Sequence, residues 1–399
     1  LKYISSHGLY QYAKLADEAG KPLNTIRDYR PNYLDSVEAL GFQPWRYSIL
    51  SDIANTEQKT DIRNLIARVG LKYKINNRFN IDLQYQQEYQ TTQTRLLRNA
   101  ETYAARNLVN QFSVRNSNGT FNYPVPIGGI LDQSHNSMNN QNLRGQVNYQ
   151  ETINNNHSIN AIAGFEIRQR NTTGFSRTVL GYDEQYGIGR SNLNYQNSLP
   201  VHPFGNRLIP ASSNLETGLI NRFISFYTNA GYVYKRKYSF TISARTDGAN
   251  LFGVKKKKKI VPLWSTGIGW DISKESFYQV DWMPFFKLRG TYGFNGNAAN
   301  ANSLLTATYF TSGTTGLPTA VISSPPNPFL RWEKVKTMNL AIDFSTRNNR
   351  ISGTIEWFSK RGQDLLQNQE LATYTGFRTI RANGAETITK GIEAQINTK

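Results

Sequence analysis

The sequence predicts an all-β protein, more specifically part of an antiparallel transmembrane β-barrel of about a dozen strands with short periplasmic turns and long extracellular loops. Apolar and polar residues alternate with a period of two along much of the chain. Short and long connections alternate between these segments. Aromatic residues make up 12% of the 399 residues, although only 38% are hydrophobic and the mean hydropathy is −0.55. Such a composition suits a barrel with an apolar outer face and a polar lumen.

The first hairpin is predicted from residues 65–85. Two alternating segments flank a three-residue turn at 76–78, which is the pattern of a β-hairpin. If Ile75 lies opposite Phe79, then Leu71 faces Leu83, and one face of the hairpin is wholly apolar. The other face is polar or ionic.

Further hairpins and single strands follow the same rule. Alternating segments flank short turns near 154–157, 235–237 and 346–349, and further strands are predicted at 264–272, 286–294 and 392–396. A compact, helical-looking connection covers residues 273–284. The long connections, rich in Asn, Gly, Ser and Pro, are expected near 90–140, 172–218, 247–260, 298–331 and 361–386.

Two short helices are expected within or beside these loops, because apolar residues recur there every three or four positions. The spaced residues are Ala104, Leu108 and Phe112 in the stretch 97–112, and Leu34, Val37 and Leu40 nearer the N-terminus. Packing on the rim of the sheet is the expected role of both helices.

A soluble β-sandwich is the alternative explanation of the alternation. It would bury each apolar face against a second sheet and use Greek-key connections. Aromatic residues near the predicted strand ends favour the membrane barrel, since amphipathic rings gather at the boundary between lipid and water. Cross-strand pairing in a soluble sheet would explain any single one of them. The candidates for membrane girdles are Tyr73, Tyr85, Tyr149, Tyr232, Tyr234, Tyr238 and Trp357.

No catalytic, cofactor or metal site is predicted, and the chain is not expected to be an enzyme. Cysteine is absent, and the four histidines are scattered. We find none of the metalloprotease, serine hydrolase or phosphate-loop motifs. The sequence therefore offers no group of residues that points to a particular reaction.

The formal charge of +18, from 46 Lys and Arg against 28 Asp and Glu, would suit nucleic acid. However, the one basic run, five lysines at 255–259, falls in a predicted extracellular loop, so nucleic acid is not an expected partner. Other basic residues are predicted on the lumen side and would favour an anionic cargo, but acidic Asp82 and Glu166 share that face. These basic residues are Arg68, Lys72, Arg144, Arg168, Arg245 and Arg289.

The later hairpins carry a series of longer motifs. Residues 243–253 read SARTDGANLFG, residues 261–275 read VPLWSTGIGWDISKE, and residues 286–297 read FKLRGTYGFNGN. Together with 330–334 (LRWEK) and 389–393 (TKGIE), they closely resemble the barrel of the SusC/RagA family of TonB-linked outer-membrane proteins. The residues that carry this resemblance are Arg245, Asp247, Gly248, Phe252, Gly253, Trp264, Gly269, Trp270, Leu288, Arg289, Tyr292, Gly293, Gly296, Asn297, Trp332, Glu333, Lys390, Gly391 and Glu393.

The resemblance implies a barrel of about 22 strands with a plugged lumen. Residues 1–399 are expected to form part of that barrel, with the plug domain and the remaining strands outside this chain. The implied location is the outer membrane of a Gram-negative, Bacteroidota-like cell, in contact with its lipid.

The function implied by the resemblance is TonB-dependent import of nutrient oligomers. The expected cargo is an oligosaccharide, or in some members a peptide. The expected partners are a SusD-like surface lipoprotein over the extracellular mouth and the TonB complex, reached through the plug. The alternative is a soluble or surface all-β carbohydrate-binding module without transport activity.

Overall fold

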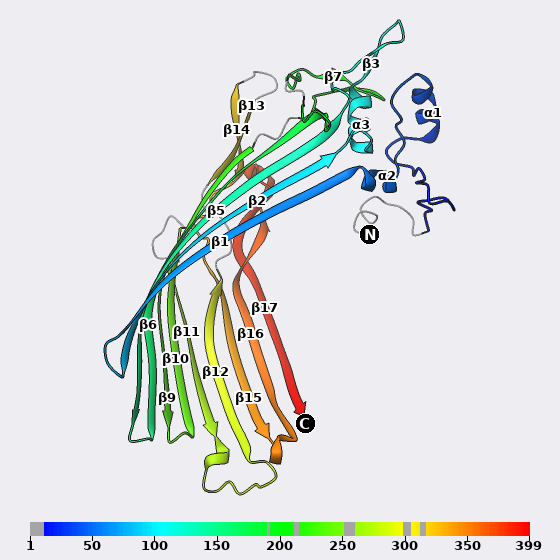
Figure 1. Ribbon diagram of the computed structural model, residues 1–399. Helices are drawn as coiled ribbons and strands as arrows, with labels where there is room; N and C mark the ends of the chain where they lie inside the picture. Colours follow the sequence, from blue (N-terminus) through cyan, green and yellow to red (C-terminus); the bar gives the residue numbers. More distant parts are fainter. Residues whose placement is uncertain (1–11, 190–191, 211–214, 251–259, 298–304, 312–316) are drawn as a thin grey trace.

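One large antiparallel sheet contains most of the described residues, which in this computed structural model are 12–189, 192–210, 215–250, 260–297, 305–311 and 317–399 (Figure 1). Its 11 strands are neighbours in chain order, and the sheet is not closed, so that β1 and β17 are its edges. The strands are β1 (Thr56–Lys74), β2 (Phe79–Arg98), β5 (Gly129–Ile153), β6 (His157–Tyr182), β9 (Leu215–Tyr234), β10 (Tyr238–Ala249), β11 (Ile260–Asp271), β12 (Phe285–Asn297), β15 (Glu333–Ser345), β16 (Ile351–Glu370) and β17 (Thr379–Thr398). The predicted all-β antiparallel fold is confirmed.

The remaining elements are short. Three two-stranded sheets are formed by β3 (Val114–Arg115) with β4 (Phe121–Asn122), β7 (Leu199–Pro200) with β8 (Asn206–Arg207), and β13 (Thr306–Thr311) with β14 (Pro318–Ser324). The α-helices are α1 (Pro31–Ala39), α2 (Ile49–Ala54) and α3 (Tyr103–Phe112), and the 3-10 helices are η3 (Ile272–Lys274), η4 (Arg347–Asn349) and η5 (Thr373–Thr375).

The predicted register of the first hairpin is confirmed. Leu71 lies opposite Leu83, and the backbone N–H of Ile75 donates to the carbonyl of Phe79 across the first turn, at 3.1 Å. Tyr234 likewise lies opposite Tyr238 across the turn 235–237. Alternation excludes a slip of one residue, which would exchange the two faces of the strand, and the three-residue turn fixes the register among those that remain.

Several strands are longer than the predicted length of about ten residues, and part of the predicted long loops is strand. β2 runs to Arg98 and β5 begins at Gly129, so the connection between them is shorter than the predicted 90–140. Similarly, β16 and β17 occupy most of 361–386 and leave only 371–378 between them. In 132–142, for example, every residue except Met138 is polar, so no alternation of hydrophobicity marks this part of the strand.

The two faces of the large sheet differ in chemistry. The face that carries the alternating apolar residues, here called the apolar face, leaves large side chains exposed from β1 to β17: Leu71 is 67% exposed, Ile268 66% and Ile392 73%. Among the described residues, no second sheet forms the partner layer that a β-sandwich requires. An apolar surface spread over a whole sheet indicates contact with an apolar surrounding or partner.

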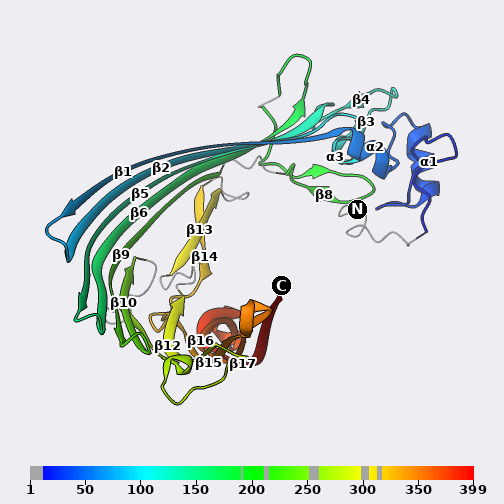
Figure 2. The same cartoon turned by 60° about the horizontal axis from the view of Figure 1, so that its bottom comes forward.

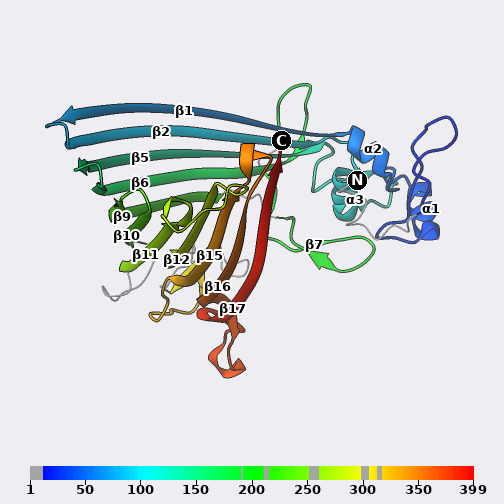
Figure 3. The same ribbon diagram turned by 90° about the horizontal axis from the view of Figure 1, so that it is seen from below.

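The buried cores lie beyond one end of the sheet and not between layers. The short connections at 75–78, 154–156, 235–237, 272–284 and 346–350 mark one end, here called the turn end; the opposite end is the loop end. Helices α1, α2 and α3 gather at the loop end, as Figures 2 and 3 show. In the described part of the chain, no helix is long and apolar enough to cross a membrane.

The two expected helices are confirmed as α1 and α3. Leu34 and Val37 are buried in α1, whereas Leu40 follows the helix and is 48% exposed. In α3 the buried apolar positions include Val109 and Phe112. The hydroxyl of Thr102 caps α3 by accepting a hydrogen bond from the backbone N–H of Ala105, which satisfies one of the unpaired donors of the first turn.

Candidate functional site on the polar face

The predicted lumen-side basic residues share the face opposite to the apolar one, here called the polar face. Lys72 lies opposite Asp82, and Arg144 lies between Gln84 and Glu166 on the neighbouring strands. Successive side chains of a strand point to opposite sides of the sheet, and residues that lie opposite each other on neighbouring strands point to the same side. The basic residues and the polar residues opposite them therefore share the polar face.

Two of these arginines are neutralised by aspartates. Arg245 Nε lies 2.7 Å from an oxygen of Asp247. Arg289 donates two hydrogen bonds to Asp343, at 2.6 and 2.9 Å, and the hydroxyl of Thr354 donates a third at 2.8 Å. These pairs cancel positive charge on this part of the polar face.

Arg144 has a different set of partners. Its Nε donates to the hydroxyl oxygen of Tyr227 at 2.7 Å, and its Nη2 donates to Gln146 Oε1 at 2.7 Å. The Tyr227 hydroxyl in turn donates to the same Gln146 oxygen at 2.9 Å. No carboxylate of the described residues lies within ion-pair distance of Arg144. These three residues, with Arg245, are here called the Tyr227 site; Arg144, Tyr227 and Arg245 border a hollow of about 370 Å³.

A glycine makes the Tyr227 site possible. Tyr227 belongs to β9 and Gln146 to β5, so the phenol must cross β6, where Gly164 lies opposite both residues. A Cβ at Gly164 would lie 2.6 Å from the Tyr227 hydroxyl oxygen and 2.5 Å from the carbonyl oxygen of Gly145. An aromatic side chain therefore covers the gap that the glycine leaves in its neighbouring strand.

Gly164→Ala is expected to displace Tyr227 and to lower the free energy of unfolding by about 1–3 kcal/mol, because the added methyl group meets backbone and ring atoms. Chemical denaturation in detergent measures the loss. Gly218→Ala in β9 is the matched control, since a Cβ there has no heavy atom within 4 Å. Equal stability of the two variants would contradict this description of the site.

The girdle candidates all lie on the apolar face. Tyr73, Tyr149, Tyr232, Tyr234 and Tyr238 lie near the turn end, whereas Tyr85 and Trp357 lie further along their strands. Four of them, Tyr149, Tyr232, Tyr234 and Tyr238, contact other aromatic rings. The ring centroid of Tyr149 lies 4.7 Å from that of Phe79, and that of Tyr238 lies 6.3 Å from that of Trp270. Their role as a girdle stays a prediction.

Glu275 connects two turns at the turn end. Its carboxylate accepts hydrogen bonds from Lys237 Nζ at 2.8 Å, from the Tyr238 hydroxyl at 2.6 Å and from Trp270 Nε1 at 3.1 Å. The hydrogen bond from Lys237 contributes most, and with the other two it lowers the pKa of Glu275 from 4.5 to about 2. The glutamate therefore stays ionised and orients two aromatic side chains of the apolar face.

The Glu275 contacts are expected to lose their stabilising effect gradually in acid. A carboxyl whose pKa is lower in the folded chain stabilises the fold fully above its unfolded pKa of 4.5, and this contribution falls as the pH drops toward about 2. The difference in thermal stability between the natural protein and Glu275→Gln should therefore be constant above about pH 5 and shrink below it. A difference that stays unchanged down to pH 2 would contradict the lowered pKa.

The family-motif residues are spread over β10, β11, β12, β15 and β17, and they do not converge on one pocket. Trp332 is buried with Leu330 and Ala249 at the loop end, and Glu333 Oε1 accepts a hydrogen bond from the backbone N–H of Leu366 at 2.9 Å. Phe252, Gly253 and the five lysines at 255–259 lie outside the described residues. The alternation in the sequence did not single out Tyr227 or Gln146. The signal that could have found them is Gly164, a glycine in the row of side chains that β6 contributes to the polar face.

The described residues contain no group of three or more His, Asp or Glu side chains placed to hold a metal ion. The polar face instead presents hydrogen-bonding amides, hydroxyls and paired charges along adjacent strands. With the exposed apolar face behind it, this up-and-down sheet is the wall of a transmembrane β-barrel. The β-barrel model of TonB dependent receptor-like proteins matches residues 9–399, and the chain belongs to that family.

The relatives are receptors of the same family. The chain is 29% identical over 265 residues to TonB-dependent receptor P26 of Formosa agariphila, covering 65% of this chain and 25% of that protein. It is 28% identical over 189 residues to TonB-dependent receptor SusC of Bacteroides thetaiotaomicron, covering 45% and 19%. The chain thus spans about a quarter or less of the length of these relatives.

The solved structure of the RagAB peptide transporter has a similar fold. The two superpose with a TM-score of 0.74 at 17% identity, over 97% of this chain and 38% of that chain. At this identity the similarity concerns the fold.

Proposed function

We propose that this chain is part of the barrel of a TonB-dependent transporter that imports nutrient oligomers across the outer membrane of a Bacteroidota-like cell. The observation that carries the proposal is the division of one continuous sheet into an exposed apolar face and a hydrogen-bonding polar face, in a chain of the TonB dependent receptor-like family. The apolar face would meet lipid and the polar face would line the lumen.

The orientation follows from the two ends of the sheet. Outer-membrane barrels have short periplasmic turns and longer extracellular loops. The turn end would therefore face the periplasm, with Tyr73, Tyr149 and Tyr238 as its girdle, and the loop end would face the outside.

The partners follow from the same arrangement. A SusD-like lipoprotein would dock on the loop end, where α1, α3 and their buried cores form a folded rim. The TonB complex would act through a plug domain outside residues 1–399. The unpaired edges of β1 and β17 would continue into the remaining strands of the barrel.

The polar face favours an oligosaccharide as cargo. The charges of Arg245 and Arg289 are cancelled by Asp247 and Asp343, and much of the remaining lining is amide and hydroxyl. Such groups exchange hydrogen bonds with sugar hydroxyls. A peptide is the second candidate, because the RagAB structure of similar fold is a peptide transporter.

Growth of a deletion strain tests the proposal. The strain is expected to lose growth on the imported oligosaccharide as sole carbon source and to keep growth on the corresponding monosaccharide. Affinity purification from the complemented strain should recover a surface lipoprotein. Loss of growth on peptides alone would shift the cargo to peptides.

Fractionation tests the alternative. Recovery of the protein in the aqueous fraction without detergent would refute the transporter and favour a soluble carbohydrate-binding module. Normal growth of the deletion strain on every oligomer would refute import.

A further inference from the structure

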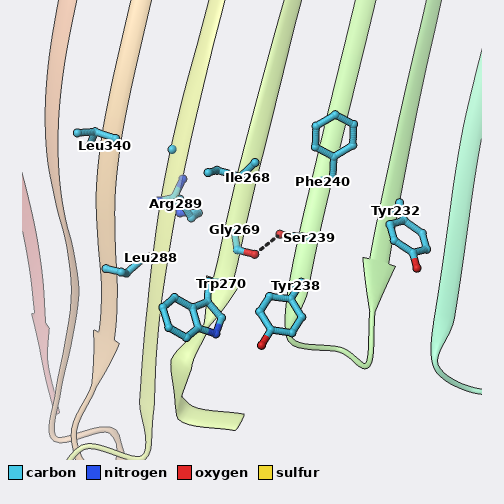
Figure 4. Close-up of a pocket in the computed structure, with 11 residues that line it drawn as sticks. Tyr232, Tyr238, Ser239, Phe240, Ile268, Gly269, Trp270, Leu288, Arg289 and Leu340 are labelled. Carbon is cyan, nitrogen blue, oxygen red and sulfur yellow. Dashed lines mark hydrogen bonds between the residues drawn. The ribbon is translucent and has the colours of Figure 1, made fainter. Parts of the chain in front are cut away.

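A hollow of about 550 Å³ lies on the apolar face near the turn end, between β9 and β15. Figure 4 shows the side chains that border it, with Phe240, Ile268 and Leu340 further from the turns and Tyr238 and Trp270 close to them. Nearly all of its lining is apolar, although it opens on the outside of the sheet. It is here called the outer groove.

The missing side chain of Gly290 creates much of the outer groove. Gly290 lies between Ile268 and Leu340 in neighbouring strands, in the middle of an otherwise apolar row. A Cβ at Gly290 would lie 3.4 Å from Leu340 Cδ2 and 3.7 Å from Ile268 Cγ1, which is ordinary van der Waals contact. The space can therefore be filled by substitution without a clash with the backbone.

Basic residues stand at the turn side of the outer groove. Lys237 is paired with Glu275, and Lys274 with Asp271 at 2.7 Å. Lys235 and Arg236 are exposed in the adjacent turn, and no carboxylate of the described residues lies within ion-pair distance of either. Lys235 Nζ lies 5.3 Å from the ring centroid of Tyr234. Two cations without counter-charges thus lie in the turn between Tyr232 and Tyr238, both of which line the hollow.

We propose that the outer groove binds one anionic glycerophospholipid from the membrane leaflet at the turn end. One acyl chain lies in the hollow over Gly290, and the phosphate group meets Lys235 and Arg236. Tyr238 and Trp270, fixed by Glu275, lie at the depth where chain and headgroup join. The inference rests on the proposed function, which places this face in lipid.

The charge pattern argues for this occupant over a second copy of the chain. In a symmetric dimer through this face, each partner would bring the same two unpaired cations to the shared contact. An anionic headgroup satisfies them, because basic residues at a membrane surface attract anionic lipids. A zwitterionic lipid offers no net negative charge to the pair.

The test uses the whole protein, purified from its own outer membrane into a mild detergent and analysed by native mass spectrometry with added phosphatidylglycerol or phosphatidylcholine. One phosphatidylglycerol is expected to remain bound per protein. Lys235→Gln with Arg236→Gln should lower its retention at least about tenfold, since each cation contributes to the attraction. Gly290→Leu should lower retention of both lipids.

The control is Arg347→Gln with Arg350→Gln, which removes two exposed cations from another connection at the turn end and should leave retention unchanged. Equal retention in all variants, or equal binding of the two lipids, would overturn the site. A dimer of the natural protein that Gly290→Leu dissociates would assign the groove to a second copy instead. Membrane extraction of the same variants separates a failure of the lipid site from a failure of the proposed function. A protein that stays in the membrane fraction but binds neither lipid selectively refutes only the lipid site. A protein found in the aqueous fraction refutes the transporter.

Discussion

Ile242→Arg is expected to lower the free energy of unfolding in a bilayer by about 2–4 kcal/mol, the cost of an arginine on the lipid side of a barrel near the bilayer midplane. Ile242 lies on the apolar face of β10, opposite Ala230 and Thr266, and it is 46% exposed. It is two residues beyond Phe240 on the same face, inside the apolar row that begins with the aromatic side chains of the turn end. Urea unfolding in lipid vesicles measures the change.

Thr241→Arg is the matched control for Ile242→Arg. Thr241 is the preceding residue, exposed on the polar face opposite two glycines, Gly231 and Gly267, so water would solvate the new charge. We expect a change within about 0.5 kcal/mol, as for an ordinary exposed position. If both variants lost the same stability, or neither did, the apolar face would not be in lipid.

The register of the sheet was predictable wherever one face meets an apolar surrounding. The pairs Leu71 with Leu83 and Tyr234 with Tyr238 follow from alternation together with the three-residue turns, because alternation excludes a slip of one residue and the turn length fixes the register among those that remain. Alternation did not predict the parts of the strands that lie beyond the apolar residues. Residues 132–142 of β5 continue the ladder with side chains that, apart from Met138, are polar on both faces, so their sequence resembles a loop.

The Tyr227 site was not predictable for a different reason. The basic residues could be assigned to the polar face, but their partners depend on lateral contacts between strands. Tyr227 reaches Gln146 over a separation of 81 residues, and only because Gly164 leaves space on the strand between them. Alternation shows which face a residue occupies; it does not show which side chain crosses a neighbouring strand.

The loop end was predicted as long connections with two helices. Its cores join segments that are distant in the chain: Trp45 Nε1 donates to Asn107 Oδ1 at 2.8 Å, across 62 residues. Tyr103 packs in the same core, where its ring centroid lies 5.2 Å from that of Tyr47. Burial and a hydrogen bond to Asp28 raise the pKa of Tyr103. No periodicity in the sequence predicts contacts of this kind.

Trp45→Ala is therefore expected to have the largest effect at the loop end, a loss of about 3–5 kcal/mol in the stability of this core. Trp45 is 0% exposed, and its ring lies 4.9 Å from that of Tyr29 and 5.9 Å from that of Phe42. Its backbone N–H also donates to Glu38 Oε1 at 2.8 Å, which ties the following segment to α1. Amide hydrogen exchange should become faster in α1 and α3 and stay slow in the strands, since the sheet keeps its ladder.

Two variants show whether the effect comes from the buried indole. Trp282→Ala removes a tryptophan that is 64% exposed and should leave exchange in α1 and α3 unchanged. Trp45→Phe keeps an aromatic ring but removes the hydrogen bond to Asn107, and should cost less than Trp45→Ala. If Trp45→Ala also accelerated exchange throughout the strands, the loop end would be part of one cooperative unit with the sheet. If α1 and α3 stayed protected, their cores would not depend on Trp45.

A folded rim is what a docking lipoprotein needs, so loss of the co-purified lipoprotein in Trp45→Ala, with the protein still in the membrane, would place that partner at the loop end.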